Sequence, residues 1–265
     1  MLEQGEAHPA DVVNADGSSA FFLVCEHASR TIPHRLGTLG LMPDDLERHI
    51  AWDIGAASVA KQMSQALDAP LVLQNYSRLV IDCNRPPDTA QAMPVVSERT
   101  VIPGNENIDD AERVSRISSI FQPFHETVSG LLDERAAAGM HTILITLHSF
   151  NRTYDGFVRP WDVGAQYNRA PEFSKCINEL LGSDEALCIG DNQPYPVNDA
   201  THYTIPVHGE QRGIAHTMLE VCNDLLCDRD GQAIWAKRLV DVLEEARGLC
   251  GLIAKHERGG DRDYA

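Results

Sequence analysis

Four apolar segments of this chain are bounded by polar residues that could do chemistry. His27, His148 and Glu220 each lie at the end of one such segment, and the fourth lies between Arg78 and Arg85. Two fixed guanidinium groups beside a buried strand are costly unless they meet an anion. In open α/β sheets, ligands bind outside the carboxyl ends of the strands. The pattern therefore predicts one shared site with metal-assisted hydrolytic chemistry.

The two histidines are candidate metal ligands. Neutral imidazoles suit zinc, and a catalytic zinc site has three protein ligands and a water. Either histidine by itself could be a surface or capping residue. Together, at separate strand ends of one sheet, His27 and His148 favour a metal.

The third ligand should be a carboxylate, and Glu26 and Asp53 compete for this role. Neighbouring residues of an extended strand point to opposite faces, so Glu26 and His27 should diverge. That favours Asp53, which falls on the apolar face of a helix predicted to open at Pro43. Alternatively, Asp53 is a buried carboxylate paired with His49 or an arginine.

Glu220 is the candidate general base. An acidic side chain among strand apolars should have a raised pKa, which a base working near neutrality needs. Alternatively, Glu220 pairs with a neighbouring arginine. His208 could polarise a carbonyl or hold the leaving group, or it could be structural. We interpret His125 as a packing residue.

The composition excludes several classes of partner. The net charge is −17, from 22 basic and 39 acidic side chains, which argues against nucleic acid and anionic membranes. No apolar run approaches the ~20 residues of a membrane span, and the first residues lack a signal-peptide pattern. The seven cysteines form no Cys-x-x-Cys pair, so we interpret them as reduced thiols of a cytoplasmic protein.

Strand and helix patterns alternate along the chain. Strands are expected at 20–25, 71–73, 79–81, 142–147, 186–189 and 214–221, and helices from 43, at 109–139, 171–181 and 232–253. The alternation predicts an α/β fold with a largely parallel sheet. We expect one domain, residues 1–265, with flexible ends at 1–18 and 257–265. Residues 82–108 lack periodicity, which in a compact domain indicates a functional loop.

Five ordered strings closely resemble the N-formylglutamate amidohydrolase family. They are Glu-His-Ala-Ser-Arg-Thr-Ile-Pro, Arg-His-Ile-Ala-Trp-Asp-Ile-Gly-Ala, Tyr-Ser-Arg-Leu-Val-Ile-Asp-Cys-Asn-Arg-Pro, Leu-His-Ser-Phe and Asp-Asn-Gln-Pro-Tyr. The resemblance runs from about Phe22 to Leu243. The pattern is also distantly similar to the zinc carboxypeptidase and aspartoacylase group.

The resemblance implies a three-layer α/β/α sandwich and a zinc-dependent hydrolase of N-acyl amino acids, with one Zn²⁺ or another divalent ion per chain. By the same resemblance, Asn84 and Arg85 hold the substrate carboxylate and Arg78 aids the oxyanion. The substrate expected is a small molecule like N-formyl-L-glutamate. The oligomeric state is left open.

Two departures from the related patterns matter. The carboxypeptidase group has His-x-x-Glu at its first ligand, whereas Ala-Ser-Arg30 follows His27 here. The family often has Glu-Ile-Arg after the last strand, where this chain has Glu220-Val-Cys222. The rival hypotheses are another N-acyl amino acid deacylase, a small carboxypeptidase, or a non-catalytic binder of acidic metabolites.

Overall fold

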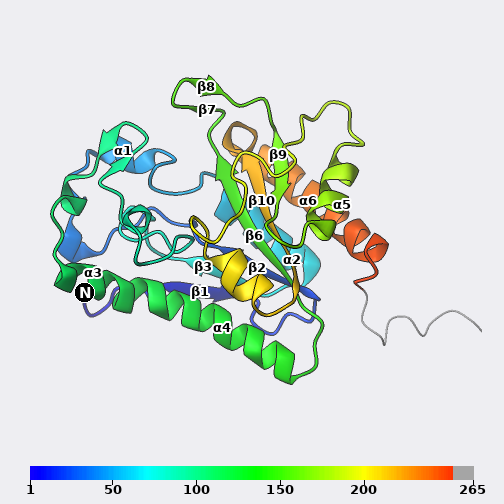
Figure 1. Ribbon diagram of the computed structural model, residues 1–265, viewed down its shortest axis with the longest axis horizontal. Helices are drawn as coiled ribbons and strands as arrows, with labels where there is room; N and C mark the ends of the chain where they lie inside the picture. The colour runs from blue at the N-terminus through cyan, green and yellow to red at the C-terminus, as the bar shows by residue number, and fades with distance from the viewer. Residues whose placement is uncertain (253–265) are drawn as a thin grey trace, which may run out of the picture.

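The computed structural model describes residues 1–252, and its centre is a six-stranded sheet with strand order β1-β3-β2-β6-β10-β9. The four inner strands run parallel, and the edge strands β1 and β9 pair antiparallel (Figure 1). The strands are β1 (Ala10–Val13), β2 (Phe21–Cys25), β3 (Leu71–Gln74), β6 (Ile143–Phe150), β9 (Val163–Gln166) and β10 (Ala215–Cys222). The predicted mixed, mostly parallel sheet is confirmed.

Helices cover both faces of the sheet, which gives the predicted three-layer sandwich (Figure 1). The alternation of β2 shows the division: Phe21 and Leu23 pack on the face of α2, α5 and α6, whereas Phe22 and Val24 pack on the face of α4. The helices are α1 (Pro43–Glu47), α2 (Ala56–Leu67), α3 (Asp110–Arg116), α4 (Gln122–Ala137), α5 (Glu172–Leu181) and α6 (Arg229–Leu249).

The helix predicted from Asp109 to Gly139 is confirmed as one long helical run. The Asp109 side chain caps it by accepting the Glu112 N–H at 2.7 Å. A π-helical turn, Ile117–Phe121, joins α3 to α4. Gly139 follows the run with φ +70°, a conformation that glycine adopts without strain.

The helix predicted to carry Asp53 is wrong in its extent. α1 ends at Glu47 and α2 begins at Ala56, so Asp53 lies in the turns between them. The Asp53 N–H donates to the His27 carbonyl at 2.9 Å, which a residue inside a helix could not do. Gly55 precedes α2 at φ +81°, where an added Cβ would lie 2.5 Å from the Leu226 side chain. The chain therefore turns at Gly55, and the helix that the apolar spacing predicted does not continue through this position.

The strand predicted at residues 79–81 is also wrong, although all three side chains are buried. A local turn and side chains satisfy this backbone: the Val80 N–H donates to the Ser77 carbonyl at 2.9 Å. Asn105 Nδ2 donates to the Leu79 carbonyl at 2.9 Å, and Arg116 Nη1 donates to the Val80 carbonyl at 3.1 Å. A short apolar run reports burial, and it does not distinguish a strand from a buried turn.

Two short hairpins lie outside the central sheet. β4 (Val96–Ser97) and β5 (Thr100–Val101) form one hairpin, and β7 (Thr153–Tyr154) and β8 (Phe157–Val158) form another.

Three other predictions concern the chain ends and a short strand. Residues 1–18, which were predicted to be flexible, contain β1. The strand predicted at 186–189 is reduced to an isolated bridge at Ile189. The predicted flexible tail, 257–265, lies outside the described residues.

Between residues 1 and 252, the helices are too short or too polar to cross a membrane. The seven cysteines, all within this part of the chain, are free thiols that form no disulfide bond with one another.

Arg116 fixes the irregular segment that carries the candidate arginines, and this generates a stability prediction. Its side chain is 1% exposed and donates to the carbonyls of Val80 and Gly104 and to the Asn105 amide oxygen. Arg116→Met leaves these buried acceptors unpaired. We expect a loss on the order of 3 kcal/mol in the free energy of unfolding, measured by chemical denaturation.

Arg99→Met is the matched control, because the Arg99 side chain is 76% exposed and its ion pair with Asp155 is at the surface. Exposed ion pairs contribute at most about 1 kcal/mol. Equal losses in the two variants would show that Arg116 is not a structural anchor.

Candidate active site

Three adjacent strands bring the candidate residues together. His27 follows β2 by two residues, His148 lies in β6, and Glu220 lies in β10. The parallel register pairs Glu220 with His148 directly. Paired residues on neighbouring strands point to the same face, so both side chains leave the sheet on one side. His148 is thus inside a strand that extends to Phe150, beyond the predicted end at 147, whereas Glu220 lies inside its strand as predicted.

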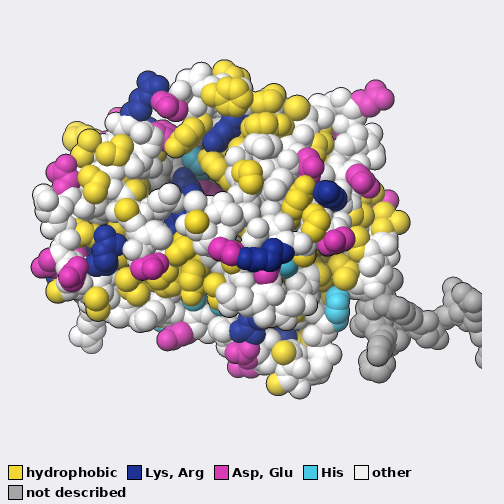
Figure 2. Space-filling view, in the orientation of Figure 1, with side chains coloured by type: hydrophobic (Ala, Val, Ile, Leu, Met, Phe, Trp, Pro, Cys, Tyr) yellow, Lys and Arg dark blue, Asp and Glu magenta, His cyan; other side chains and the backbone are white. Residues whose placement is uncertain are grey.

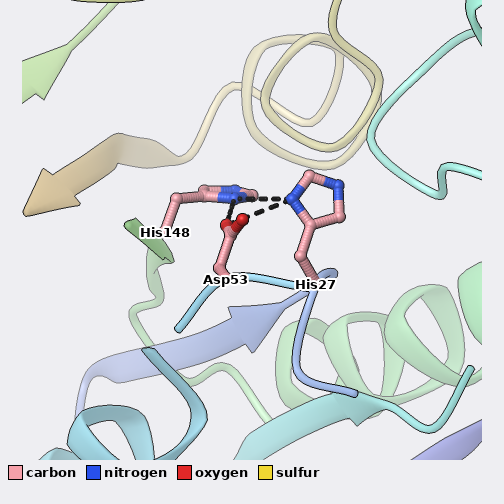
Figure 3. Close-up of side chains that lie close together, drawn as sticks. All are labelled: His27, Asp53 and His148. Atoms are coloured by element: carbon pink, nitrogen blue, oxygen red, sulfur yellow. Dashed lines mark hydrogen bonds and ion pairs between the residues drawn. The ribbon is translucent and has the colours of Figure 1, made fainter. Parts of the chain in front are cut away.

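His27, Asp53 and His148 form a compact cluster in which potential ligand atoms lie within 4.8 Å of one another (Figure 3). The Nδ1 atoms of His27 and His148 lie 3.1 and 2.9 Å from Asp53 Oδ2, and 3.2 Å from each other. All three residues are at most 5% exposed. Two imidazole nitrogens and a carboxylate oxygen form the donor set of a catalytic zinc site with an open position.

The outward nitrogen of each imidazole contacts a second carboxylate. His27 Nε2 lies 2.8 Å from Asp82 Oδ1, and His148 Nε2 lies 3.2 Å from Glu26 Oε2. These partners turn both Nδ1 atoms toward Asp53. Histidines that bind metals usually donate their other N–H to a carboxylate or carbonyl in this way. Glu26 therefore contacts the Nε2 side of His148, away from the Nδ1 atom that faces Asp53. The strand-alternation argument does not explain this position, because β2 ends at Cys25 and both Glu26 and His27 lie in the turn that follows it.

Asp53 divides its two oxygens between different partners. Oδ2 faces the histidines, while Oδ1 lies 3.0 Å from Arg78 Nη1. Burial by itself would raise the pKa of Asp53. Arg78, His27 and His148 outweigh it and hold the pKa well below the ordinary value. Asp53 therefore stays ionised in a buried site, as a metal ligand must.

The two cluster histidines have raised pKa values despite burial, which acts in the opposite direction. Asp82 and Asp53 raise the pKa of His27, and Glu26 and Asp53 raise that of His148. The positive charge of protonated imidazole rings thus balances the negative charge of the carboxylates that surround the cluster. A divalent cation is the other group that can compensate them, so the residues present fit a bound metal.

The pKa of Glu220 is raised, whereas the pKa values of the buried carboxylates Glu26, Asp53 and Asp82 are lowered. Burial raises its pKa to about 7, with Asp53 adding to the effect and His148 opposing it. Its side chain is 4% exposed, and Oε2 has no hydrogen-bond partner among residues 1–252. A carboxyl group with a pKa near neutrality and a free oxygen can both accept and return a proton.

A cavity of about 350 Å³ joins the cluster to the arginines. Its lining includes every predicted site residue except His208: the three cluster residues, Glu220, Arg78, Asn84 and Arg85. In Figure 2, a hollow in the surface exposes histidine and basic side chains within a rim that is largely hydrophobic. The cavity opens at the carboxyl ends of the strands, where ligands bind in open α/β sheets.

Arg85 and Asn84 are held differently. Arg85 Nη1 donates to the Thr201 carbonyl, and Nε lies 3.6 Å from Asp82 Oδ2. The Asn84 Oδ1 atom accepts the N–H groups of Tyr203 and Thr204, both at 3.2 Å. The Asn84 oxygen thus fixes the loop opposite, while the Arg85 guanidinium keeps N–H donors for a ligand.

His208 lies outside the cavity, contrary to a role at the reaction centre. It belongs to a π-helical segment, Ile205–Glu210, and its Nε2 lies 3.0 Å from Nδ1 of His125. His125 in turn contacts the Cys83 carbonyl at 2.8 Å. Burial lowers the pKa of His208 to about 4 and that of His125 to about 3. The pair is neutral and packs behind the loop that carries Asn84.

Sequence reasoning missed several residues of the cavity wall. His202 lines it as a neutral imidazole, because burial lowers its pKa to about 3. His49, expected only as a possible partner of Asp53, also lines it; burial lowers its pKa to about 3, and its Nδ1 lies 3.6 Å from Asp53 Oδ1. Tyr195 also lines it. Tyr195 could have been found, since it closes the string Asp-Asn-Gln-Pro-Tyr. His202 follows no periodic pattern, and only the return of its loop to the sheet brings it here.

Comparison with known proteins gives a consistent result. The sequence model of the N-formylglutamate amidohydrolase family matches residues 19–227. The gene product Atu2144 from Agrobacterium tumefaciens is 38% identical, with a TM-score of 0.91 over 94% of this chain and 99% of that one. The N-formylglutamate amidohydrolase from Ralstonia eutropha JMP134 is 17% identical and shares the fold, with a TM-score of 0.69 over 93% and 100%. No curated protein matches the chain.

The contrast between Glu220 and Glu26 predicts opposite pH dependences of stability in the metal-free protein. Glu220 binds its proton more tightly when folded, so the native state loses stability as pH rises from about 4.5 to about 7. Glu220→Gln removes this loss. Its unfolding free energy should gain up to about 3 kcal/mol on the wild type across that interval.

Glu26→Gln should behave in the reverse sense. His148 holds the pKa of Glu26 below the ordinary value against the effect of burial. Its stabilisation is therefore present above about pH 4.5 and is lost as pH falls. Denaturant titrations that extend from well below pH 4.5 up to about pH 8 measure both variants. Parallel curves for the two would contradict the assignment of a raised pKa to Glu220.

Proposed function

The chain belongs to the N-formylglutamate amidohydrolase family, as its strings suggested, and from this premise we propose that it is a metal-dependent hydrolase of N-acyl amino acids. Family membership supports a hydrolase that acts on a C–N bond. The observation that carries the proposal is the position of Glu220, paired in register with His148 beside three convergent ligand atoms. N-formyl-L-glutamate is the substrate we expect first.

His27, Asp53 and His148 would hold the metal, and Zn²⁺ suits their donor atoms best. When bound, such an ion lowers the pKa of a water toward ~7 and polarises the acyl carbonyl. Asp82 and Glu26 lie 2.8 and 3.2 Å from the outer Nε2 atoms of the two imidazoles, and such carboxylates would favour the tautomer that presents Nδ1 to the site. The metal is thus proposed from the donor set and from the carboxylates behind it.

Glu220 is the proposed proton carrier. It accepts the proton of the attacking water and returns it to the departing nitrogen, which its pKa near 7 permits in both directions. Arg78 lines the cavity beside Asp53, and it is the proposed donor to the oxygen that becomes negative as water adds to the acyl carbon. Its place at the cluster supports that role. His208 has no place in this scheme.

Arg85 is the proposed anchor for the substrate α-carboxylate. A guanidinium fork binds a carboxylate through two parallel N–H groups, and this fixes the direction of the scissile bond. Asn84 contributes by accepting the N–H groups of residues 203 and 204, which fixes the loop whose Thr201 carbonyl accepts from Arg85. The cavity is large enough for a small N-acyl amino acid and for little more.

The rival functions differ in the residues that each of them requires. Another deacylase or a small carboxypeptidase would use the same groups on a different acyl part. A non-catalytic binder of acidic metabolites would need Arg85 and could dispense with Glu220. The pKa of Glu220 favours a catalyst, because a binder gains nothing from a carboxyl group poised near neutrality. The single domain and the cytoplasmic location stay predictions.

A metal assay joined to a substrate panel tests the proposal. Purified protein should bind about one divalent ion, and the loaded form should hydrolyse at least one N-acyl amino acid. Asp53→Asn removes a ligand, so metal affinity should fall much more than in Glu26→Gln, where about 10–100-fold is expected. Metal-loaded Glu220→Gln should lose about 10²–10⁴ in kcat. A reversed order of the first two variants would make Glu26 the ligand.

A second prediction concerns the carboxylate anchor. Arg85→Lys keeps the charge and loses the fork, so KM for a carboxylate substrate should rise about tenfold or more while kcat changes less. The control is the same substrate as its α-carboxamide, which wild type and variant should bind alike. Steady-state kinetics of wild type and variant with both compounds measure these constants. An unchanged KM, with no preference for acid over amide, would remove Arg85 from this role.

A further inference from the structure

Arg159 is a buried cation with no carboxylate partner among residues 1–252. It is 6% exposed, and its contacts are neutral: the Asn151 carbonyl at 3.2 Å from Nη1 and the Tyr195 hydroxyl at 2.9 Å from Nη2. Its Cζ atom lies 4.7 Å from the centroid of the Tyr195 ring and 4.8 Å from that of Tyr154. Burying a guanidinium without an anion is costly, so its place behind the cavity wall needs a reason.

Tyr195 is the group through which this charge meets the cavity. Its ring lines the cavity, and its hydroxyl oxygen accepts the N–H of Arg159. The hydroxyl proton has no acceptor among the described residues. A hydroxyl whose oxygen accepts from a cation is a stronger donor, because the bond draws electron density from the oxygen. Tyr195 therefore offers the cavity one free, polarised O–H.

The proton stays on this hydroxyl at neutral pH. Burial raises the pKa of Tyr195 and the Glu220 carboxylate raises it further, while Arg159 and Arg78 act in the other direction. Tyr195 lines the same cavity as the proposed base, Glu220, and the proposed oxyanion donor, Arg78.

Arg78 alone is a poor oxyanion site. Its Nε donates to the Ile50 carbonyl at 3.1 Å, its Nη2 donates to the His49 carbonyl, and its Nη1 faces Asp53. Most of its five N–H groups are therefore committed to the protein. A second donor is needed if the negative oxygen is to be well stabilised, and sites of this kind commonly use more than one.

We propose that the Tyr195 hydroxyl, held by Arg159, is a catalytic hydrogen-bond donor to the oxyanion that forms as water adds to the acyl carbon. The inference rests on the proposed function. Tyr195 touches the reacting oxygen, and Arg159 is a positioning residue that acts through the hydroxyl. No proton is transferred in this step; the O–H bond donates and is retained.

Tyr195→Phe tests the proposal, because it removes the hydroxyl and keeps the ring. In metal-loaded enzyme, kcat should fall about 10²–10³-fold, with KM within about threefold and metal content unchanged. A phosphonamidate analogue of the substrate, which carries a tetrahedral oxyanion, should lose a similar factor in affinity by calorimetry. The product amino acid should bind as it does to wild type.

Arg159→Met distinguishes direct from indirect action. It should lower kcat less than Tyr195→Phe, and the double variant should be no slower than Tyr195→Phe alone, because one hydroxyl carries both effects. Tyr167→Phe is the matched control. It removes a hydroxyl that donates to Asp191 Oδ2 at 3.3 Å and lies outside the cavity, and it should leave kcat unchanged.

Three results would overturn the proposal. They are a Tyr195→Phe enzyme with kcat within about threefold of wild type, equal losses of affinity for the analogue and the product, or a fall in melting temperature that parallels the fall in kcat. Wild-type protein that is loaded with metal and hydrolyses no N-acyl amino acid would instead overturn the proposed function. An active wild type and an equally active Tyr195→Phe would overturn this inference alone.

Discussion

The buried carboxylate of Asp53 is the group around which the candidate site is organised. One oxygen faces the Nδ1 atoms of two histidines, and the other faces Arg78. A buried carboxylate is tolerable only where positive or hydrogen-bonding partners surround it. Its partners come from segments far apart in the sequence, so their meeting at one point constrains the β2 end, the β6 strand and the turn at Arg78 together.

That constraint extends outward through a second ring of acidic groups. Asp82 and Glu26 hold the outer nitrogens of the histidines, and Asp82 also lies near Arg85. The same loop therefore orients a metal-binding candidate and a carboxylate-binding candidate. Glu220 lies outside this ring, and its Oε2 has no hydrogen-bond partner among residues 1–252. The pKa of Glu220 is raised while those of Asp53, Asp82 and Glu26 are lowered, so the carboxylates of one site acquire opposite protonation behaviour from their environments.

Much of this arrangement was predictable, and the errors have a common physical cause. The strings around His27, His148 and Glu220 gave correct positions at strand ends or within strands. The helix predicted through Asp53 and the strand predicted at 79–81 were wrong, although the burial of their apolar residues was right. In both segments the backbone is satisfied by side chains such as Asn105 and Arg116 or by a distant carbonyl. Periodicity cannot register partners of that kind.

By itself, the sequence determined the α/β class and indicated the two histidines and Glu220 as candidates for a metal site and its base, because residue type and strand-end position limit what such groups can do. The family resemblance added Arg85 as the candidate carboxylate anchor. The tertiary structure decided which carboxylate faces the cluster, with Asp53 inward and Glu26 behind His148. It also placed His208 outside the cavity and brought Tyr195 to the cavity wall, where Arg159 donates to its hydroxyl. These outcomes depend on which loops return to the sheet and on which atom of a ring faces which neighbour. Both are set by long-range packing and by hydrogen bonds that local pattern does not encode.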